Sequence, residues 1–385
     1  MLKLPSWLAA PDTPTETNIN IIRALAVSSV FLHHAYAYLG VKTPIFGMAG
    51  GLIGVLLFFL ISGYLIGKSA EKHALPDYVR HRFFRIYPAF ITLFLVIGFA
   101  VGSLKISKIA EDPLGFLSYL VMLQHLFPEK LMRFSTLHVE WTLTIEVLWY
   151  VLAPAVVFLR RPWALVASVA LIAVSFLWYY LARSGDLDPL YGGKAVMDAI
   201  HPAYQVLFIQ SAFPAQIGFF IAGFLVYRYY RYLRLIPLLL LLCAVPFAFP
   251  EVPPFAHHGV NPLAPHGLAM AALLVLLLRL PALRSRLITW LSDISYSIYL
   301  LHAVVMVAIG LHYGWKGWGA FAVACAATLL LSSLSFILIE QPAMRYARHR
   351  DWRQARPTPL ATAKAWITGT RQPVPFPAVN KPAVS

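Results

Sequence analysis

Long apolar runs recur along almost the whole chain and constrain its fold more than any other feature. Between residues 19 and 339, mostly apolar stretches alternate with short polar or basic segments. A helix of about 17 to 25 such residues crosses the hydrocarbon core of a bilayer, where every backbone polar group needs an internal partner. The 385 residues are 59% hydrophobic and 12% charged, with a mean hydropathy of +0.70. The sequence therefore predicts an all-α, polytopic membrane protein.

The apolar runs predict about ten transmembrane helices. The segment at residues 113 to 127 is too short to be an eleventh, and we expect it to be re-entrant or interfacial. The seventh and eighth helices are the shortest of the set. The predicted spans are 19–41, 48–67, 86–104, 138–158, 163–182, 204–227, 235–249, 265–280, 288–311 and 317–339.

Lys and Arg residues provide a test of this number, because they accumulate on the cytoplasmic side of membrane proteins. If the N-terminus is inside, ten spans place most of the 31 Lys and Arg residues in cytoplasmic segments. An added or missing helix would invert every loop downstream of it, so we expect both termini to be cytoplasmic. The net charge of +15 comes from short clusters between apolar runs, which favours lipid head groups over a nucleic-acid partner.

Three segments are expected from this pattern. They are a cytoplasmic N-terminal segment at 1–18, a membrane domain at 19–345 and a cytoplasmic tail at 346–385. The tail is rich in proline, a composition that cannot bury a core, and we predict that it is disordered. The first 18 residues show no pattern of a cleavable signal peptide. No Cys or His cluster with ligand spacing predicts a metal site.

Arg23 and His34 are the first ionisable side chains at membrane depth, where such groups are costly and mark candidate sites. They are eleven residues apart on one predicted helix, so they share a face and lie about 16 Å apart along its axis. We predict that both are catalytic, with Arg23 nearer the cytoplasm and His34 in the outer half. The alternative is that Arg23 extends to the head groups and that His34 bonds to a neighbouring helix.

Glu146 is predicted to lie at a depth similar to that of His34, on the helix at 138–158. A carboxylate beside an imidazole orients the ring and raises its basicity, as a general base requires when it takes a proton from a hydroxyl. We therefore predict that Glu146 orients His34 in catalysis. The alternative is a hydrogen bond that only packs two helices together.

Arg82 and Arg85 lie in a basic segment that we expect to be a cytoplasmic loop, just before Tyr87 and Pro88. Arginines three residues apart share a helical face and bind phosphate oxygens bidentately. This pattern predicts a site for a pyrophosphate or ribose phosphate. The alternative is an anchor at the membrane surface.

A polar stripe marks the ninth predicted span. Ser295, Tyr299 and His302 are spaced four and three residues apart and share one helical face. We expect Tyr299 and His302 to line a cavity, while hydrogen bonds between helices are the alternative role.

These elements, in this order, resemble the membrane acyltransferase 3 family of bacterial O-acyltransferases, which modify O-antigens, peptidoglycan, exopolysaccharides and nodulation factors. Many members of that family read Glu-Glu where this chain has Glu146-Val147. The matching motifs cover nearly all of the membrane domain. They are Arg23-Ala-Leu-Ala-Val followed by His34, Gly54-Val-Leu-Leu-Phe58-Phe-Leu-Ile-Ser62-Gly63, Arg82-x-x-Arg85-Ile-Tyr87-Pro88, Trp141-Thr-Leu-x-x-Glu146-x-x-Trp149-Tyr150, Ile294-Ser-Tyr-Ser-Ile-Tyr-Leu-Leu-His302 and Glu340-Gln-Pro342.

The resemblance implies a multi-pass enzyme of the bacterial inner membrane that moves an acyl group, by family default acetyl, from acyl-CoA to a hydroxyl of a carbohydrate. It implies that Arg23 and His34 are essential and that Arg82 and Arg85, with Tyr87, handle acyl-CoA. Trp141 is expected to line the cavity. Acyl-CoA would be a co-substrate, with no permanently bound cofactor, and the partners would be a free or lipid-linked carbohydrate and membrane lipids.

Two other classes remain open at this point. In a proton-coupled transporter or flippase, Arg23, His34 and Glu146 would form a relay and substrate site at the midplane. The sequence shows no symmetry between two halves that would favour this interpretation, and the arginine pair has no evident use there. A structural scaffold would not account for three ionisable residues at membrane depth.

Overall fold

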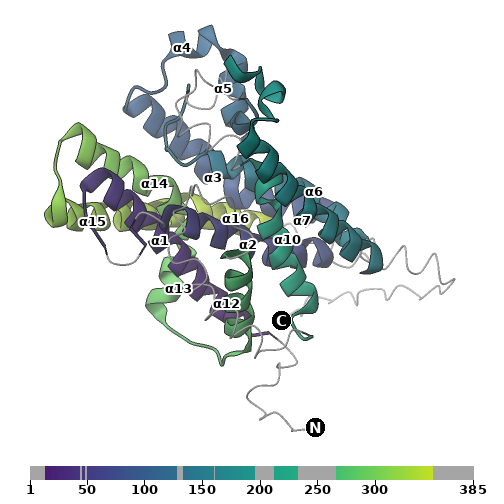
Figure 1. Ribbon diagram of the computed structural model, residues 1–385. Coiled ribbons are helices and arrows are strands. Elements are labelled where there is room, and N and C mark those ends of the chain that lie inside the picture. Colours follow the sequence, from purple (N-terminus) through teal and green to yellow (C-terminus); the bar gives the residue numbers. More distant parts are fainter. Residues whose placement is uncertain are drawn as a thin grey trace, which may run out of the picture.

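The computed structural model describes residues 14–43, 46–47, 50–127, 133–159, 161–195, 212–232 and 266–349. Every regular element within these ranges is helical (Figure 1), which confirms the all-α class. The short helical turns are η2 (Glu16–Asn18), η3 (Gln124–Leu126), η5 (Asp188–Tyr191), η8 (Ala308–His312) and η9 (Phe336–Glu340). The helices are α1 (Ile19–Leu39), α2 (Gly50–Lys72), α3 (Leu75–Ala100), α4 (Ile106–Glu111), α5 (Pro113–Leu120), α6 (Trp141–Phe158), α7 (Arg161–Ser184), α10 (Phe213–Tyr229), α12 (Leu268–Arg279), α13 (Arg286–Asp293), α14 (Ser295–Val307), α15 (Gly317–Ser335) and α16 (Gln341–His349).

Six of the described helices are long and apolar enough to cross a membrane. They are α2, α3, α6, α7, α14 with its continuation to His312, and the rod from Gly317 to Arg348. The protein is therefore a multi-pass membrane protein, while ten spans with cytoplasmic termini stay a prediction. The predicted span at 235–249, the first 13 residues and the tail after residue 349 lie outside the described residues.

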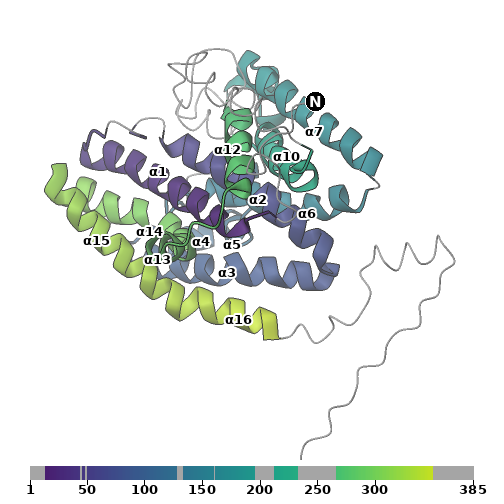
Figure 2. The same cartoon turned by 90° about the horizontal axis from the view of Figure 1, so that it is seen from below.

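The two outer edges of the bundle are apolar. Figure 2 shows α15 and α16 as one long rod along one edge, beside α3, with α7 at the opposite edge. Large side chains such as Trp163 and Val169 on α7, and Leu330 and Leu338 on the rod, are exposed. An apolar surface of this kind is stable against lipid.

The helix α2 is the centre of the bundle and packs against α1 and α10. An added Cβ at Gly63 would come within 1.9 Å of Phe220 O on α10, and one at Gly223 of α10 within 1.9 Å of Leu60 O on α2. The two glycines thus let the backbones touch, as small residues do between membrane helices. This close contact fixes the helix that carries one wall of the site.

The start of α1 is held by a buried amide. The Asn18 side chain donates to Leu277 O at 2.9 Å and to Pro281 O at 3.0 Å, and accepts from Leu283 N at 2.9 Å. Asn18 is fully buried, so these bonds satisfy polar groups that would otherwise be costly. The clamp fixes the end of α1 that carries Arg23.

Two predicted boundaries are wrong. The basic segment with Arg82 and Arg85 is not a loop, because α3 already begins at Leu75. Pro76 occupies its first turn, where a missing N–H costs nothing.

The predicted span at 288–311 is also divided. Its first part forms the separate helix α13, which ends before Ile294, and α14 begins at Ser295. Ser285 caps α13 by accepting a hydrogen bond from Ile288 N. The segment at 113–127 contains only the eight-residue α5 and the turn η3, and α5 is too short to span a bilayer.

Candidate active site

A cavity of about 110 Å³ lies between α1, α2, α3, α6 and α14. It brings together five residues predicted as site residues from the sequence: Arg23, Arg82, Arg85, Glu146 and Tyr299. They come from four different helices, so only the tertiary fold assembles them. The remaining polar lining residues are Ser62, Thr142, Tyr150, Ser295 and Tyr296. Three guanidinium groups and one carboxylate line the cavity, which makes it a candidate site for an anion.

Arg82 is held over the cavity by one hydrogen bond and two rings. Its Nη2 donates to Ser69 Oγ at 3.0 Å, and its guanidinium lies 5.9 Å from the ring centroids of Tyr78 and Tyr150. Its Nε–H is buried and has no hydrogen-bond partner in the structure. A buried donor without an acceptor is costly, and here it belongs to a cation that lines a cavity.

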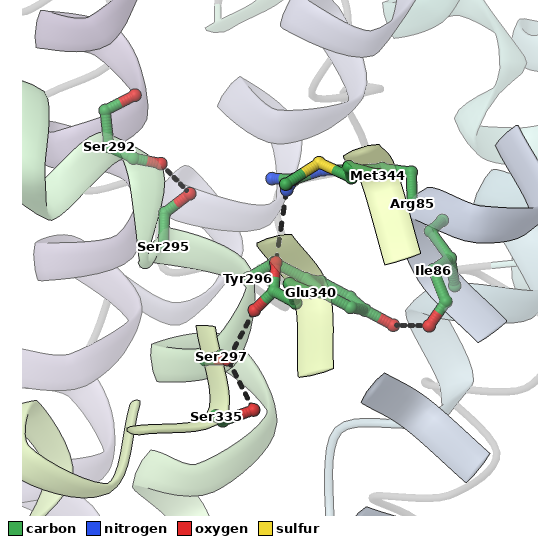
Figure 3. A network of polar contacts seen from close by, with 9 residues as sticks. All are labelled: Arg85, Ile86, Ser292, Ser295, Tyr296, Ser297, Ser335, Glu340 and Met344. Atoms are coloured by element: carbon green, nitrogen blue, oxygen red, sulfur yellow. Dashed lines mark hydrogen bonds and ion pairs between the residues drawn. The ribbon is translucent and has the colours of Figure 1, made fainter. Parts of the chain in front are cut away.

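Arg85 forms an ion pair with Glu340 (Figure 3), and the Glu340 side chain is fully buried. Arg85 Nη1 lies 3.1 Å from Glu340 Oε2, and the guanidinium lies 5.9 Å from the Tyr296 ring centroid. Glu340 also accepts a short hydrogen bond from Ser297 Oγ. The charge of Arg85 is thus compensated by the protein, whereas Glu146 is the one carboxylate among the lining residues.

The network around Glu340 joins three helices. Ser297 on α14 and Ser335 at the end of α15 are hydrogen-bonded at 2.8 Å, and Tyr296 OH donates to Ile86 O of α3 at 3.1 Å (Figure 3). Glu340 is the last residue of the π turn η9. A π turn within a long helix changes the direction in which the following side chains point, and such turns are frequent at functional sites. The network fixes Arg85 at the cavity wall.

Glu146 accepts two hydrogen bonds at one carboxylate oxygen. Ser62 Oγ donates to Oε1 at 3.0 Å, and Tyr150 OH donates to the same atom at 2.7 Å. Neither partner is His34, so the structure does not place Glu146 in the hydrogen-bonded position predicted for it. It lies instead with the arginines in the cavity.

His34 contacts His302 instead. Its Nδ1 lies 2.9 Å from His302 Nε2 and 3.1 Å from Val30 O, one turn earlier on α1. The ring also stacks on Tyr38, at a centroid distance of 5.6 Å. His302, predicted to line the cavity, is not among its lining residues and is instead the direct neighbour of the predicted catalytic histidine. Tyr299, which lines the cavity, lies 5.9 Å from His302 between ring centroids.

Tyr87 and Trp141 lie elsewhere. Tyr87 OH donates to Val121 O at 3.3 Å and its ring stacks on Phe83, while the Trp141 ring packs 5.9 Å from His125. Neither residue is among those that line the cavity. The motifs that contain Tyr87 and Trp141 therefore contribute other residues to the cavity, such as Arg85 and Glu146.

A comparison with protein families adds an independent observation. Residues 16–337 match a family described as an acyltransferase domain. The chain belongs to the acyltransferase 3 family. The match covers most of the chain and confirms the resemblance inferred from the motifs, and the protein is an O-acyltransferase of the membrane.

Relatives of this acyltransferase 3 protein are similar along most of its length. Nodulation protein 10 of Rhizobium leguminosarum bv. viciae is 24% identical, over 85% of this chain and 93% of the relative. Acyltransferase MdmB of Streptomyces mycarofaciens is 27% identical, over 81% of this chain and 84% of the relative. An 84-residue segment is 40% identical to an O-acetyl transferase of Shigella phage Sf6, covering 21% of this chain and 25% of that protein. No solved structure matches the chain.

The candidate site includes residues to which sequence reasoning did not assign a role. Ser62 and Tyr150 bond Glu146, and Glu340 compensates Arg85. Glu340 carried a usable signal, because it is an ionisable residue at the end of an apolar run. Ser62 and Tyr150 carried none beyond their place in the motifs, since hydroxyl groups are common in membrane helices. Within the described ranges, no cluster of three metal-ligating side chains occurs.

Proposed function

We propose that this O-acyltransferase moves an acetyl group from acetyl-CoA, bound from the cytoplasmic side of the bacterial inner membrane, to a carbohydrate hydroxyl. The observation that carries the proposal is the arginine-lined cavity. Arg23, Arg82 and Arg85 meet there, and Arg82 Nε–H still lacks an acceptor. An anionic donor with phosphate groups supplies the missing acceptor oxygens.

The arginines divide into two kinds. Arg85 is neutralised by Glu340, so it supports the wall. Arg82 makes one neutral hydrogen bond and two ring contacts, and it keeps its charge and one N–H for a ligand. Arg82 is therefore assigned to the donor's phosphates, with Arg23 further along the cavity. Glu146 partly balances the positive charge of the cavity wall.

The reaction centre is assigned to His34, which lies about 16 Å from Arg23 along the axis of α1. A donor with a long pantetheine arm can place its phosphates at Arg82 and its thioester toward His34. The acceptor hydroxyl gives its proton to His34, and its oxygen forms a bond to the thioester carbonyl carbon. The carbon–sulfur bond breaks, and the proton passes from His34 to the leaving thiolate.

The acceptor is assigned to the opposite side of the membrane from the donor. His34 lies in the outer half of α1 if the N-terminus is cytoplasmic, as the distribution of basic residues predicts. A carbohydrate that is lipid-linked or being exported can reach such a site from the extracytoplasmic face. The family of this chain is one of acyltransferases, which favours this scheme over a relay in a transporter.

The direct test measures CoA release from acetyl-CoA by purified protein in lipid, with a crude cell-envelope glycan extract as acceptor. We expect turnover by the wild type, none by His34→Ala, and turnover by Arg82→Ala only at high acetyl-CoA. Arg286→Ala, an exposed arginine on α13, is the matched control and should behave as the wild type. If the wild type neither binds acetyl-CoA nor turns it over, the assignment of donor and reaction is wrong.

A further inference from the structure

We propose that His302 is the positioning residue for His34, in that it accepts the Nδ1–H of the catalytic imidazole and leaves Nε2 as the proton acceptor. This inference rests on the proposed function, because it gives His34 a partner in the acetyl transfer. The carrying observation is the distance of 2.9 Å between His34 Nδ1 and His302 Nε2. A hydrogen bond between two imidazole nitrogens needs one protonated and one unprotonated nitrogen.

The tautomer of His302 is decided by its own helix. His302 Nδ1 lies 2.9 Å from Ile298 O. A carbonyl oxygen only accepts hydrogen bonds, so Nδ1 carries the proton and Nε2 of the neutral ring carries a lone pair. His302 is 1% exposed, which leaves its Nε2 without access to water and makes a protein donor necessary.

The tautomer of His34 follows from this arrangement. Its Nδ1 faces two groups that only accept, namely His302 Nε2 and Val30 O at 3.1 Å. The proton of neutral His34 therefore lies on Nδ1, and Nε2 is the free base. Val30 is on the same helix as His34, so it turns with α1. His302 is on α14 and is the contact that fixes the ring relative to the rest of the site.

The packing around His302 supports a fixed position. The Phe31 ring lies 6.3 Å and the Tyr299 ring 5.9 Å from the His302 ring, measured between centroids. Tyr299 in turn hydrogen-bonds Thr142 at 2.6 Å. His302 thus connects His34 to the wall of the arginine cavity through neighbouring rings.

The arrangement also acts during the reaction. When the acceptor hydroxyl gives its proton to His34 Nε2, the ring becomes a cation with protons on both nitrogens. The Nδ1–H then donates as part of a charged group, and such hydrogen bonds are about twice as strong as neutral ones. His302 keeps its own proton on Nδ1 throughout, so it stabilises the imidazolium without taking part in proton transfer, as the buried acceptor of a catalytic histidine does elsewhere.

The experiment compares His302→Leu with His302→Gln by steady-state CoA release. Leucine removes the acceptor, and we expect kcat to fall by about 10- to 100-fold, with KM for acetyl-CoA unchanged, since loss of a group that orients a functional histidine typically has an effect of this size. Glutamine places a carbonyl oxygen near the position of Nε2, and we expect it to restore most of kcat. His312→Gln, an exposed histidine at the end of the same helix, is the control and should leave both constants unchanged.

A second measurement uses the wild-type protein, so it does not depend on whether the His302 variants fold. Nitrogen-15 NMR of histidine-labelled wild-type protein in lipid distinguishes the two ring nitrogens, and the His34 signals are assigned by their loss in His34→Gln. We expect a protonated Nδ1 and an unprotonated Nε2. The opposite tautomer, or wild-type kcat in His302→Leu, would overturn the role of His302 while the acetyl transfer stands. Lack of turnover in the wild type would instead overturn the proposed function.

Discussion

At the scale of single residues, the site depends on which charges the protein already neutralises. Arg82 and Arg85 are three residues apart and look equivalent in the sequence. In the structure, Arg85 has the buried Glu340 as its counter-ion, while Arg82 has only neutral partners and a free Nε–H. We therefore expect the same residue type to have two different uses, one for the fold and one for the ligand.

If Arg82 binds the phosphates of the donor, its replacement should change KM for acetyl-CoA. Replacing Arg82 by Ala should raise KM for acetyl-CoA by about 10- to 100-fold, because a charged hydrogen bond contributes roughly 1.5 to 3 kcal/mol. The change in kcat should be small. Arg82→Lys should recover only part of the loss, since an ammonium lacks the fork of a guanidinium. Titration of acetyl-CoA in the release assay measures this, and an unchanged KM in Arg82→Ala would remove Arg82 from the donor site.

The ion pair of Arg85 predicts a loss of stability. Glu340→Gln should destabilise the protein by about 3 kcal/mol, because it removes the counter-ion of a partly buried guanidinium. The double variant Arg85→Met and Glu340→Leu should be more stable than Glu340→Gln alone, since it leaves no unpaired charge. Thermal unfolding in one detergent ranks the three proteins. Equal midpoints for the single and the double variant would contradict a structural role for this pair.

At the scale of elements, the bundle depends on backbone contact between α2 and α10. Their contact uses Gly63 and Gly223, each of which faces a carbonyl of the other helix. In a lipid environment, packing of this kind replaces the hydrophobic driving force between helices. The position of Ser62, next to Gly63 and bonded to Glu146, depends on the same contact.

The close contact at Gly63 predicts that even a substitution by alanine prevents normal folding. Gly63→Ala would place a Cβ 1.9 Å from a backbone oxygen, so α2 and α10 must separate. We expect a large drop in the yield of folded protein, read from its monodisperse fraction on size exclusion in detergent. Gly319→Ala on α15 is the matched control, because its new Cβ would meet only the Trp315 ring at 3.4 Å, an ordinary contact. Wild-type yield from Gly63→Ala would show that the two helices are not held this closely.

At the scale of the whole molecule, the proposed reaction needs the donor and the acceptor on opposite sides of the membrane. The arginine cavity contains Arg23, in the second turn of α1, and Arg82 and Arg85, in the first half of α3, whereas His34 lies near the end of α1. The distribution of Lys and Arg predicts that the first of these ends is cytoplasmic. The orientation of the protein thus decides which substrate reaches which residue.

The orientation can be measured with single cysteines in a Cys243→Ser, Cys325→Ser background. Lys105→Cys is predicted to face the outside and Arg284→Cys the cytoplasm, and both positions are exposed. We expect a membrane-impermeant maleimide to label position 105 in intact cells and position 284 only after permeabilisation. The reverse pattern would place the donor cavity on the wrong side for cytoplasmic acetyl-CoA.

Much of the site was accessible from the chain alone. Ionisable residues in apolar runs are costly, so Arg23, His34 and Glu146 could be identified as candidate site residues from the sequence. The spacing of Arg82 and Arg85 indicated a binding site for an anion. The structure gathers four of these five in one cavity. Helix ends were predicted less well, because a basic segment before an apolar run can be either a loop or the first several turns of the helix, as α3 shows.

The class of the protein follows from the pattern of apolar runs alone. Apolar runs of spanning length can only fold as helices in a bilayer, because the backbone has no other hydrogen-bond partner there. The pairing of side chains was decided by the tertiary structure. Depth along two helices suggested Glu146 beside His34, but depth says nothing of which face each helix turns to its neighbours. That rotation, fixed by packing, set His302 against His34, Ser62 against Glu146 and Glu340 against Arg85.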